Sequence, residues 1–100
     1  MGQPDWETRE MKALFQTLLR LKNEKEMATF MRDIATISEL RELSLRWEAA
    51  KKIDQKVPYR TIAKSTGLST ATISRIAFWL NNGEGGYRSA LRDEATNNKK

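Results

Sequence analysis

Three features of the sequence predict an all-α fold. Apolar residues recur at spacings of three and four along most of the chain, which is the period of an amphipathic helix. Capping residues and helix breakers such as Pro58, Gly67 and Gly83 separate these periodic segments. No segment shows the alternation of a β-strand or the turn of a β-hairpin. One hundred residues is the size of one domain, so we expect a single helical domain over residues 1–100.

The first half of the chain predicts three helices within an N-terminal region, residues 5–57. The first helix begins at Pro4 and Asp5, because proline is tolerated in a first turn, and its apolar face is wide enough for burial on two sides. The sequence "TISE" at 36–39 has the capping-box pattern and predicts the start of the third helix. The apolar positions of the three helices are Met11, Leu14, Phe15, Leu18, Leu19 and Leu21; Met27, Phe30, Met31 and Ile34; and Ile37, Leu40, Leu43, Trp47, Ala50 and Ile53.

Residues 58–82 have the pattern of a helix-turn-helix motif. Gly67 ends a helix of about 59–66, and Ser69 caps a second helix that runs to about 81–82. Two helices that cross at about 90–120° leave room only for a small side chain where they meet, and Ala63 provides it. The apolar residues expected in the shared core are Ile62, Leu68, Ile73 and Ile76. The alternative interpretation is an ordinary helical hairpin with a tolerant surface.

A glycine-rich segment, "GEGGY", follows this motif. We expect a flexible loop there, then a sixth helix over 87–95 and a polar tail over 96–100. A phosphate-binding loop is a second interpretation of the glycines, but no strand precedes them and no Lys-Ser or Lys-Thr pair follows.

The helix after Ser69 carries short side chains on its outward face. With 100° per residue and Ile73 at the centre of the buried face, Ala71 and Arg75 point away from the core. A helix that enters the major groove needs short side chains at its N-terminal end, hydroxyls for base edges and a methyl group for thymine. The residues that we expect to contact bases are Thr70, Ala71, Thr72 and Ser74.

Positive charge is concentrated in the second half of the chain. Residues 51–100 hold ten Lys and Arg against four Asp and Glu, whereas residues 1–50 hold eight against nine. Such a basic half is typical of a surface that faces a polyanion, and a merely solvated surface is the alternative. We expect the first helix of the motif to lie across the phosphate backbone of DNA. The phosphate-contacting residues would be Arg60, Lys64 and, from the second helix, Arg75.

The sequence lacks the residues that several classes of protein function require. The chain has no Cys and no His, which removes disulfides, thiolate nucleophiles, zinc-finger ligands and imidazole bases. Its 13 acidic residues show no pairing that suggests catalysis, so we expect no enzyme, cofactor or metal site. No apolar run approaches the roughly 20 residues of a membrane helix, and the lack of Cys fits a reducing compartment. We therefore expect a cytosolic protein.

From about residue 10 to 90 the sequence resembles the Trp repressor superfamily, and within it the short YerC/YecD branch. The matching segments are "ATISELRELSLRWE", "PYRTIAKSTGLSTATISR" and "NNGEGGY", and the most specific part is "TATISR" after "TGLS". The resemblance implies a six-helix subunit in an intertwined homodimer whose N-terminal helices interlock. It also implies a protein of the bacterial cytosol that associates with the nucleoid. It also implies one recognition helix per subunit, with half-sites about 34 Å apart on an inverted repeat.

The resemblance also implies an effector pocket. In the Trp repressor, tryptophan lies between two arginines and changes the angle of the recognition helices. The matching arginines here are Arg46 and Arg75, Thr36 matches a residue that lines the pocket, and Trp79 stands where a serine holds the ligand's amino group.

The sequence departs from the repressor in this pocket. Besides Trp79, Ile76 replaces a glycine and Asp33 replaces an apolar lining residue. The two bulky substitutions, Ile76 and Trp79, crowd the cavity, so we expect no response to tryptophan. Three alternatives stay open: Trp79 fills the slot itself, a different small ligand binds, or Trp79 simply packs against a neighbouring helix.

The leading functional hypothesis is a sequence-specific transcriptional regulator, in particular a repressor, that binds double-stranded DNA as a homodimer. The second is a protein-interaction adaptor that keeps the fold without contacting DNA, because an interlocked helical dimer exposes grooves for partner helices. Strong salt dependence and a preferred DNA sequence would favour the first, and their absence the second.

Overall fold

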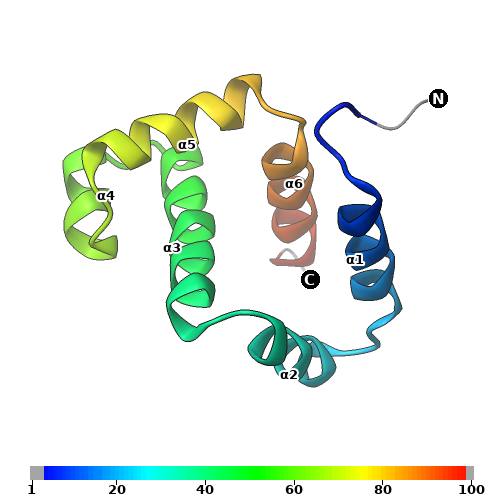
Figure 1. Cartoon of the computed structure of the whole chain (residues 1–100). Helices are drawn as coiled ribbons and strands as arrows, with labels where there is room; N and C mark the ends of the chain where they lie inside the picture. Colours follow the sequence, from blue (N-terminus) through cyan, green and yellow to red (C-terminus); the bar gives the residue numbers. More distant parts are fainter. Residues whose placement is uncertain (1–3, 99–100) are drawn as a thin grey trace. The chain divides into compact units, whose positions relative to one another are not determined.

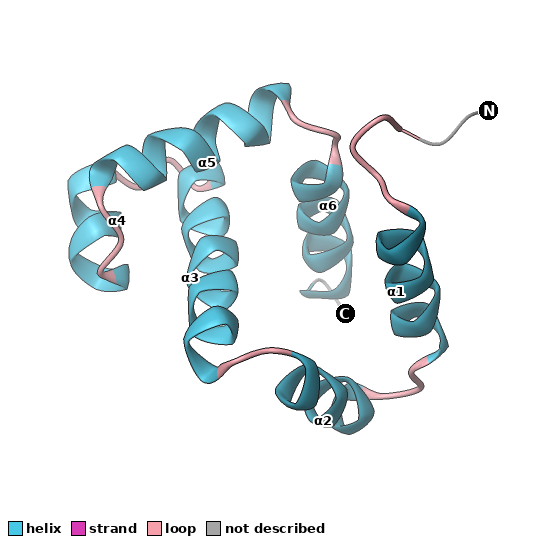
Figure 2. Cartoon of the chain, viewed as in Figure 1, coloured by secondary structure: helices cyan, strands magenta, loops and turns pink. Residues whose placement is uncertain are grey.

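The computed structural model describes residues 4–98, which form six α-helices and no strand (Figures 1 and 2). The helices are α1 (Arg9–Arg20), α2 (Glu24–Ile34), α3 (Ile37–Asp54), α4 (Tyr59–Thr66), α5 (Thr70–Asn82) and α6 (Gly86–Asn98). The predicted all-α fold is therefore confirmed. No helix in this range is long and apolar enough to span a bilayer.

The first helix starts later than the sequence analysis predicted. Instead of beginning at Pro4 and Asp5, α1 begins at Arg9, and Pro4 belongs to a turn in which its carbonyl accepts from the Glu7 amide at 3.0 Å. Thr8 is the cap, because its Oγ1 accepts from the Met11 amide at 3.0 Å. A threonine hydroxyl satisfies an amide of the first turn that a helix starting at proline would leave without a partner.

The capping box before α3 forms as predicted. The Thr36 Oγ1 accepts from the Glu39 amide at 3.0 Å, and the Glu39 carboxylate accepts from the Thr36 amide at 2.8 Å. Each side chain thus satisfies one backbone amide of the other residue, which fixes where α3 begins.

The chain divides into two compact units near the start of α3, Met1–Leu40 and Arg41–Lys100. The first unit contains α1 and α2, and neither helix has a buried residue. Their apolar faces are present but uncovered, as illustrated by Leu19, which is 86% exposed. Exposed apolar faces of this kind are typical of interaction surfaces.

The second unit has the buried core. Its centre consists of fully or nearly fully buried residues from α3, α4 and α5: Ala49, Ala50, Ile62, Ile73, Ile76 and Leu80. Partly buried residues surround this centre, among them Tyr87 and Leu91 of α6. The Tyr87 ring stacks on Trp47 of α3, with centroids 6.4 Å apart and the planes 9° from parallel. Four helices therefore share one core, and α5 contributes most of its large side chains.

The end of α3 contains a non-glycine residue in the left-handed region. Lys56 has a φ of 67°, its amide donates to the Ile53 carbonyl at 2.9 Å, and the Val57 amide donates to the Lys52 carbonyl at 3.0 Å. These two bonds are those of a Schellman motif, which normally has glycine at this position. The motif turns the chain sharply from α3 towards α4.

The last helix is longer than predicted. It runs from Gly86 to Asn98, whereas the sequence analysis expected 87–95 and a polar tail over 96–100. Polar composition alone does not end a helix, and neither Gly nor Pro follows Gly86 in the sequence. Residues 99–100 of the expected tail lie outside the described residues.

Candidate nucleic-acid interface

The helix-turn-helix forms where the sequence predicted it. Gly67 has a φ of 78°, and its amide donates to the Ala63 carbonyl at 2.8 Å to end α4. The buried Thr66 hydroxyl donates to the Ile62 carbonyl at 2.7 Å and accepts from the Leu68 amide at 3.2 Å. Thr66 thus satisfies polar groups on both sides of the turn, a role that the sequence analysis did not anticipate because threonine at a helix end has no unique signature.

The N-terminal end of α5 is capped by a serine. Ser69 Oγ accepts from the Thr72 amide and donates to the Thr72 hydroxyl, each at 3.0 Å. Such a cap fixes the first turn of the helix, which is the part that a recognition helix presents to DNA.

The two faces of α5 differ sharply. Ile73, Ile76, Ala77 and Leu80 are all buried, and they hold one side of the helix against the core. On the opposite side, Thr70, Ala71 and Ser74 are exposed, as is Arg75. Because none of the first three has a long side chain, the backbone of α5 is accessible to a surface as close as the floor of a DNA groove.

Thr72 differs from the other three expected base contacts. It is half-buried, and its hydroxyl oxygen already accepts a hydrogen bond from Ser69. The hydroxyl proton of Thr72 is left to donate, so a base-edge acceptor such as guanine O6 or thymine O4 suits it best.

Two cations lie on the exposed surface of α4. Arg60 and Lys64 make no ion pair or hydrogen bond through their side chains within residues 4–98. Together with Thr61 and Ala63 they line an open depression of about 450 Å³. Two unpaired cations one helical turn apart, beside a small apolar surface, can bind phosphates along a DNA backbone.

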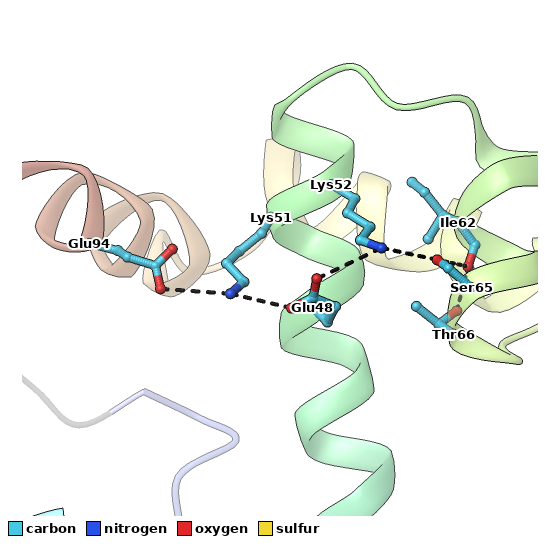
Figure 3. A network of polar contacts seen from close by, with 7 residues as sticks. All are labelled: Glu48, Lys51, Lys52, Ile62, Ser65, Thr66 and Glu94. Carbon is cyan, nitrogen blue, oxygen red and sulfur yellow. Dashed lines mark hydrogen bonds and ion pairs between the residues drawn. The ribbon is translucent and has the colours of Figure 1, made fainter. Parts of the chain in front are cut away.

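Other lysines expected in the basic surface are already paired. Lys51 Nζ lies 3.3 Å from a Glu48 carboxylate oxygen and 3.8 Å from one of Glu94 in α6. Lys52 Nζ lies 3.8 Å from Glu48 and donates to the Ser65 hydroxyl of α4 at 3.1 Å (Figure 3). These lysines connect α3 to α6 and α4. Fewer cationic side chains are therefore free to bind a polyanion than the number of Lys and Arg residues in the sequence suggests.

The residues expected to form an effector pocket have other partners. Arg46 forms an ion pair with Glu42 one turn earlier on α3, at 2.8 Å. Thr36 belongs to the first unit, where its hydroxyl caps α3. Arg75 makes no side-chain bond with the other described residues. Trp79 is 54% exposed and packs edge-to-face against Phe78, with ring centroids 5.2 Å apart.

A cluster at the end of α5 was missed by the sequence analysis. Arg88 of α6 donates to Asp54 at the end of α3 and to Asn81 in the last turn of α5, each at 2.9 Å. Asp54 and Arg88 are 34 residues apart, and no local pattern in the sequence links them.

Comparison with known proteins places this arrangement in a family. The model of the Trp repressor protein family matches residues 9–95. The chain belongs to the Trp repressor family. It is 40% identical over 83 residues to the uncharacterized protein YerC of Bacillus subtilis, an alignment that covers 83% of this chain and 80% of YerC.

Two solved structures have the same fold. A TrpR-like protein from Eubacterium eligens is 41% identical and superposes with a TM-score of 0.84 over 88% of this chain and 91% of that one. A putative Trp repressor from Staphylococcus aureus is 36% identical, with a TM-score of 0.83 and 89% of both chains covered. The Trp repressor family is a regulatory, DNA-binding family rather than an enzymatic one, which agrees with the helix-turn-helix described above.

Proposed function

We propose that this Trp repressor family member is a homodimeric transcriptional regulator, acting as a repressor, that binds an inverted-repeat DNA sequence in the bacterial cytosol. The observation that carries the proposal is the outward face of α5. Thr70, Ala71 and Ser74 are exposed there, on a helix whose opposite side is buried in the core. A rigidly held helix with short polar side chains outward fits the major groove and offers hydroxyl and methyl groups to base edges.

Affinity for the DNA backbone would come from α4 and from Arg75. The side chains of Arg60 and Lys64 are exposed and have no protein partner among the described residues. Such phosphate contacts contribute affinity and fix the position of the protein along the duplex, but they do not distinguish one DNA sequence from another.

The homodimer would be built through α1 and α2. Neither helix buries a residue in a single chain, although each carries a continuous apolar face that includes Phe15, Leu19 and Ile34. A second copy of the same chain offers the same faces, and two interlocked copies would remove them from water. Two recognition helices would then bind half-sites about 34 Å apart.

The proposed regulator does not respond to tryptophan. Ile76 is buried in the core, so its bulk cannot move aside for a ligand. Trp79 is 54% exposed in a single chain, so it remains available to fill the effector slot itself in the proposed dimer.

The test substitutes one expected base-contacting residue and one expected phosphate-contacting residue. Binding is measured to a DNA sequence that the protein retains from sheared genomic fragments and to a random duplex. We expect Ser74→Ala to weaken binding to the retained sequence by about 5- to 100-fold, the value of one base contact, with little change on random duplex. Arg60→Gln should weaken binding to both duplexes and reduce the slope of log affinity against log salt by about one. Equal losses on both duplexes for both variants would refute base contact by α5 and favour an adaptor with incidental DNA affinity.

A further inference from the structure

One arginine joins three helices of the second unit at the C-terminal end of α5. The Arg88 guanidinium donates through Nη1 to Oδ1 of Asp54 and through Nη2 to Oδ1 of Asn81, each at 2.9 Å. Asp54 is the last residue of α3, Asn81 lies in the last turn of α5, and Arg88 lies in the first turn of α6. We call these three residues the Arg88 clamp.

The geometry of the clamp is fixed from both sides. The Asn81 amide group donates through Nδ2 to the Ala77 carbonyl of its own helix at 3.0 Å, which turns its oxygen towards Arg88. A guanidinium is planar and presents its N–H groups at fixed angles, so two simultaneous bonds define the direction between the two acceptors. A single point charge such as a lysine ammonium does not define that direction in the same way.

The clamp complements the contacts at the other end of the motif. There Lys52 of α3 donates to Ser65 of α4 at 3.1 Å, and the core residues Ile73 and Ile76 seat the start and middle of α5. The final turn of α5 has only Leu80 buried, while its neighbours Asn81 and Asn82 are exposed. Arg88 therefore adds a polar contact to a turn of α5 in which the core covers one side chain only.

We propose that Arg88 is a positioning residue: by joining Asp54 to Asn81 it sets the direction of α5 relative to α3 and holds the recognition helix ready for DNA without a small-molecule ligand. The inference rests on the proposed DNA-binding function. Arg88 lies at the far end of α5 from Thr70 and Ala71, so it acts on base contact through the direction of the helix. A small rotation of α5 about its C-terminal end produces a larger displacement at its N-terminal end, because α5 spans 13 residues, or about 20 Å.

The side chains of the clamp are half-exposed, so an effect on the direction of α5 can be distinguished from an effect on folding stability. The side chains of Arg88 and Asp54 are 42% and 43% exposed. Ion pairs at such exposure add little to the free energy of folding, since water competes with them. A purely structural role thus predicts almost no effect when the clamp is opened, whereas a positioning role predicts a selective loss on the preferred DNA sequence.

The experiment measures the affinity of the full-length protein for two duplexes, one retained from genomic DNA and one of random sequence, with no added metabolite. The main variant is Arg88→Lys, which keeps the positive charge and so leaves attraction to phosphate unchanged. Arg92→Lys is the matched control, because Arg92 lies on the same helix, is exposed, and makes no side-chain bond within the described residues. Asp54→Ala removes the acceptor of Arg88 on α3 and so opens the clamp from that side, and thermal melting is recorded for every variant.

We expect Arg88→Lys and Asp54→Ala each to lower the affinity ratio between the two duplexes at least about 5-fold, the lower end of the range for a typical coupling between two sites. The double variant should lose no more than the larger single loss, because both substitutions open the same clamp. Arg92→Lys should leave the ratio and the melting temperature unchanged. An unchanged ratio in Arg88→Lys and Asp54→Ala, or equal losses on both duplexes, overturns the positioning role alone. If the wild-type protein itself shows no preference, the proposed function fails and the positioning role falls with it.

Discussion

Ser69 and Thr72 are joined by two hydrogen bonds of 3.0 Å, one from the Thr72 amide to the Ser69 oxygen and one between their hydroxyls. The residue that caps α5 is therefore bonded directly to a residue expected to contact bases. In the proposed DNA complex, helix stability and base contact would be coupled at this position, because the same hydroxyl fixes the first turn and limits how the Thr72 side chain can rotate.

Substitution of the cap should affect stability first. We expect Ser69→Ala to lower the free energy of unfolding by about 1 kcal/mol, because it removes the acceptor for the Thr72 amide. Ser69→Asp keeps an acceptor and is the control, with a loss well below that of alanine. Urea denaturation followed by circular dichroism measures both, and equal losses in the two variants would show that the side-chain cap is unimportant.

Glycine at position 56 should stabilise the protein. Lys56 has a φ of 67°, which costs a residue with a Cβ about 1–2 kcal/mol. The larger backbone entropy of glycine in the unfolded chain offsets part of that gain, so we expect Lys56→Gly to raise the free energy of unfolding by about 0.5–1 kcal/mol. Lys56→Ala removes the charge but keeps the Cβ, and it should bring no such gain. A comparable gain in both variants would attribute the effect to charge instead of backbone conformation.

Gly83 should not tolerate a side chain. A Cβ built at this position lies 2.5 Å from the Trp79 carbonyl oxygen, which is a backbone atom that cannot rotate away. We expect Gly83→Ala to lower the melting temperature by several degrees, as a loss of about 1–3 kcal/mol would in a chain of this size. Gly86→Ala is the matched control, because nothing lies within 4 Å of its Cβ position. A loss from Gly86→Ala as large as that from Gly83→Ala would contradict the steric explanation.

The proposed dimer depends on the apolar face of α1. Wild-type protein at micromolar concentration should scatter light as twice the 11.5 kDa chain. Leu19→Glu places a charge at an exposed leucine of that face and should shift the mass towards a single chain. Gln16→Glu adds the same charge at an exposed polar position of the same helix and should leave the mass unchanged. A single-chain mass for the wild type would rule out the dimer.

Much of the fold could be predicted because its signals are local. The capping box at Thr36 and Glu39, the left-handed turn at Gly67 and the cap at Ser69 each depend on residues within four positions of one another. Helical periodicity likewise predicted the burial of Ile62, Ile73 and Ile76. The start of α1 was wrong because threonine at position 8 and proline at position 4 are both acceptable first-turn signals, and the hydroxyl cap prevailed.

The candidate site was less predictable where it depends on distant residues. The Arg88 clamp joins positions 34 residues apart, and the pairing of Lys51 with Glu94 depends on how α3 and α6 meet. A count of charges cannot distinguish such paired lysines from the unpaired Arg60 and Lys64. The exposed short residues of α5 were predictable, since they follow from the helical period once Ile73 is placed in the core.

We propose above all that α5 contacts specific DNA sequences without a ligand. The most direct test incubates purified full-length protein with sheared genomic DNA at physiological salt, with no added metabolite, and sequences the retained fragments. We predict enrichment of a short inverted repeat whose half-site centres are about one helical turn, or 34 Å, apart. Retained fragments with no sequence enriched above the input would contradict the account.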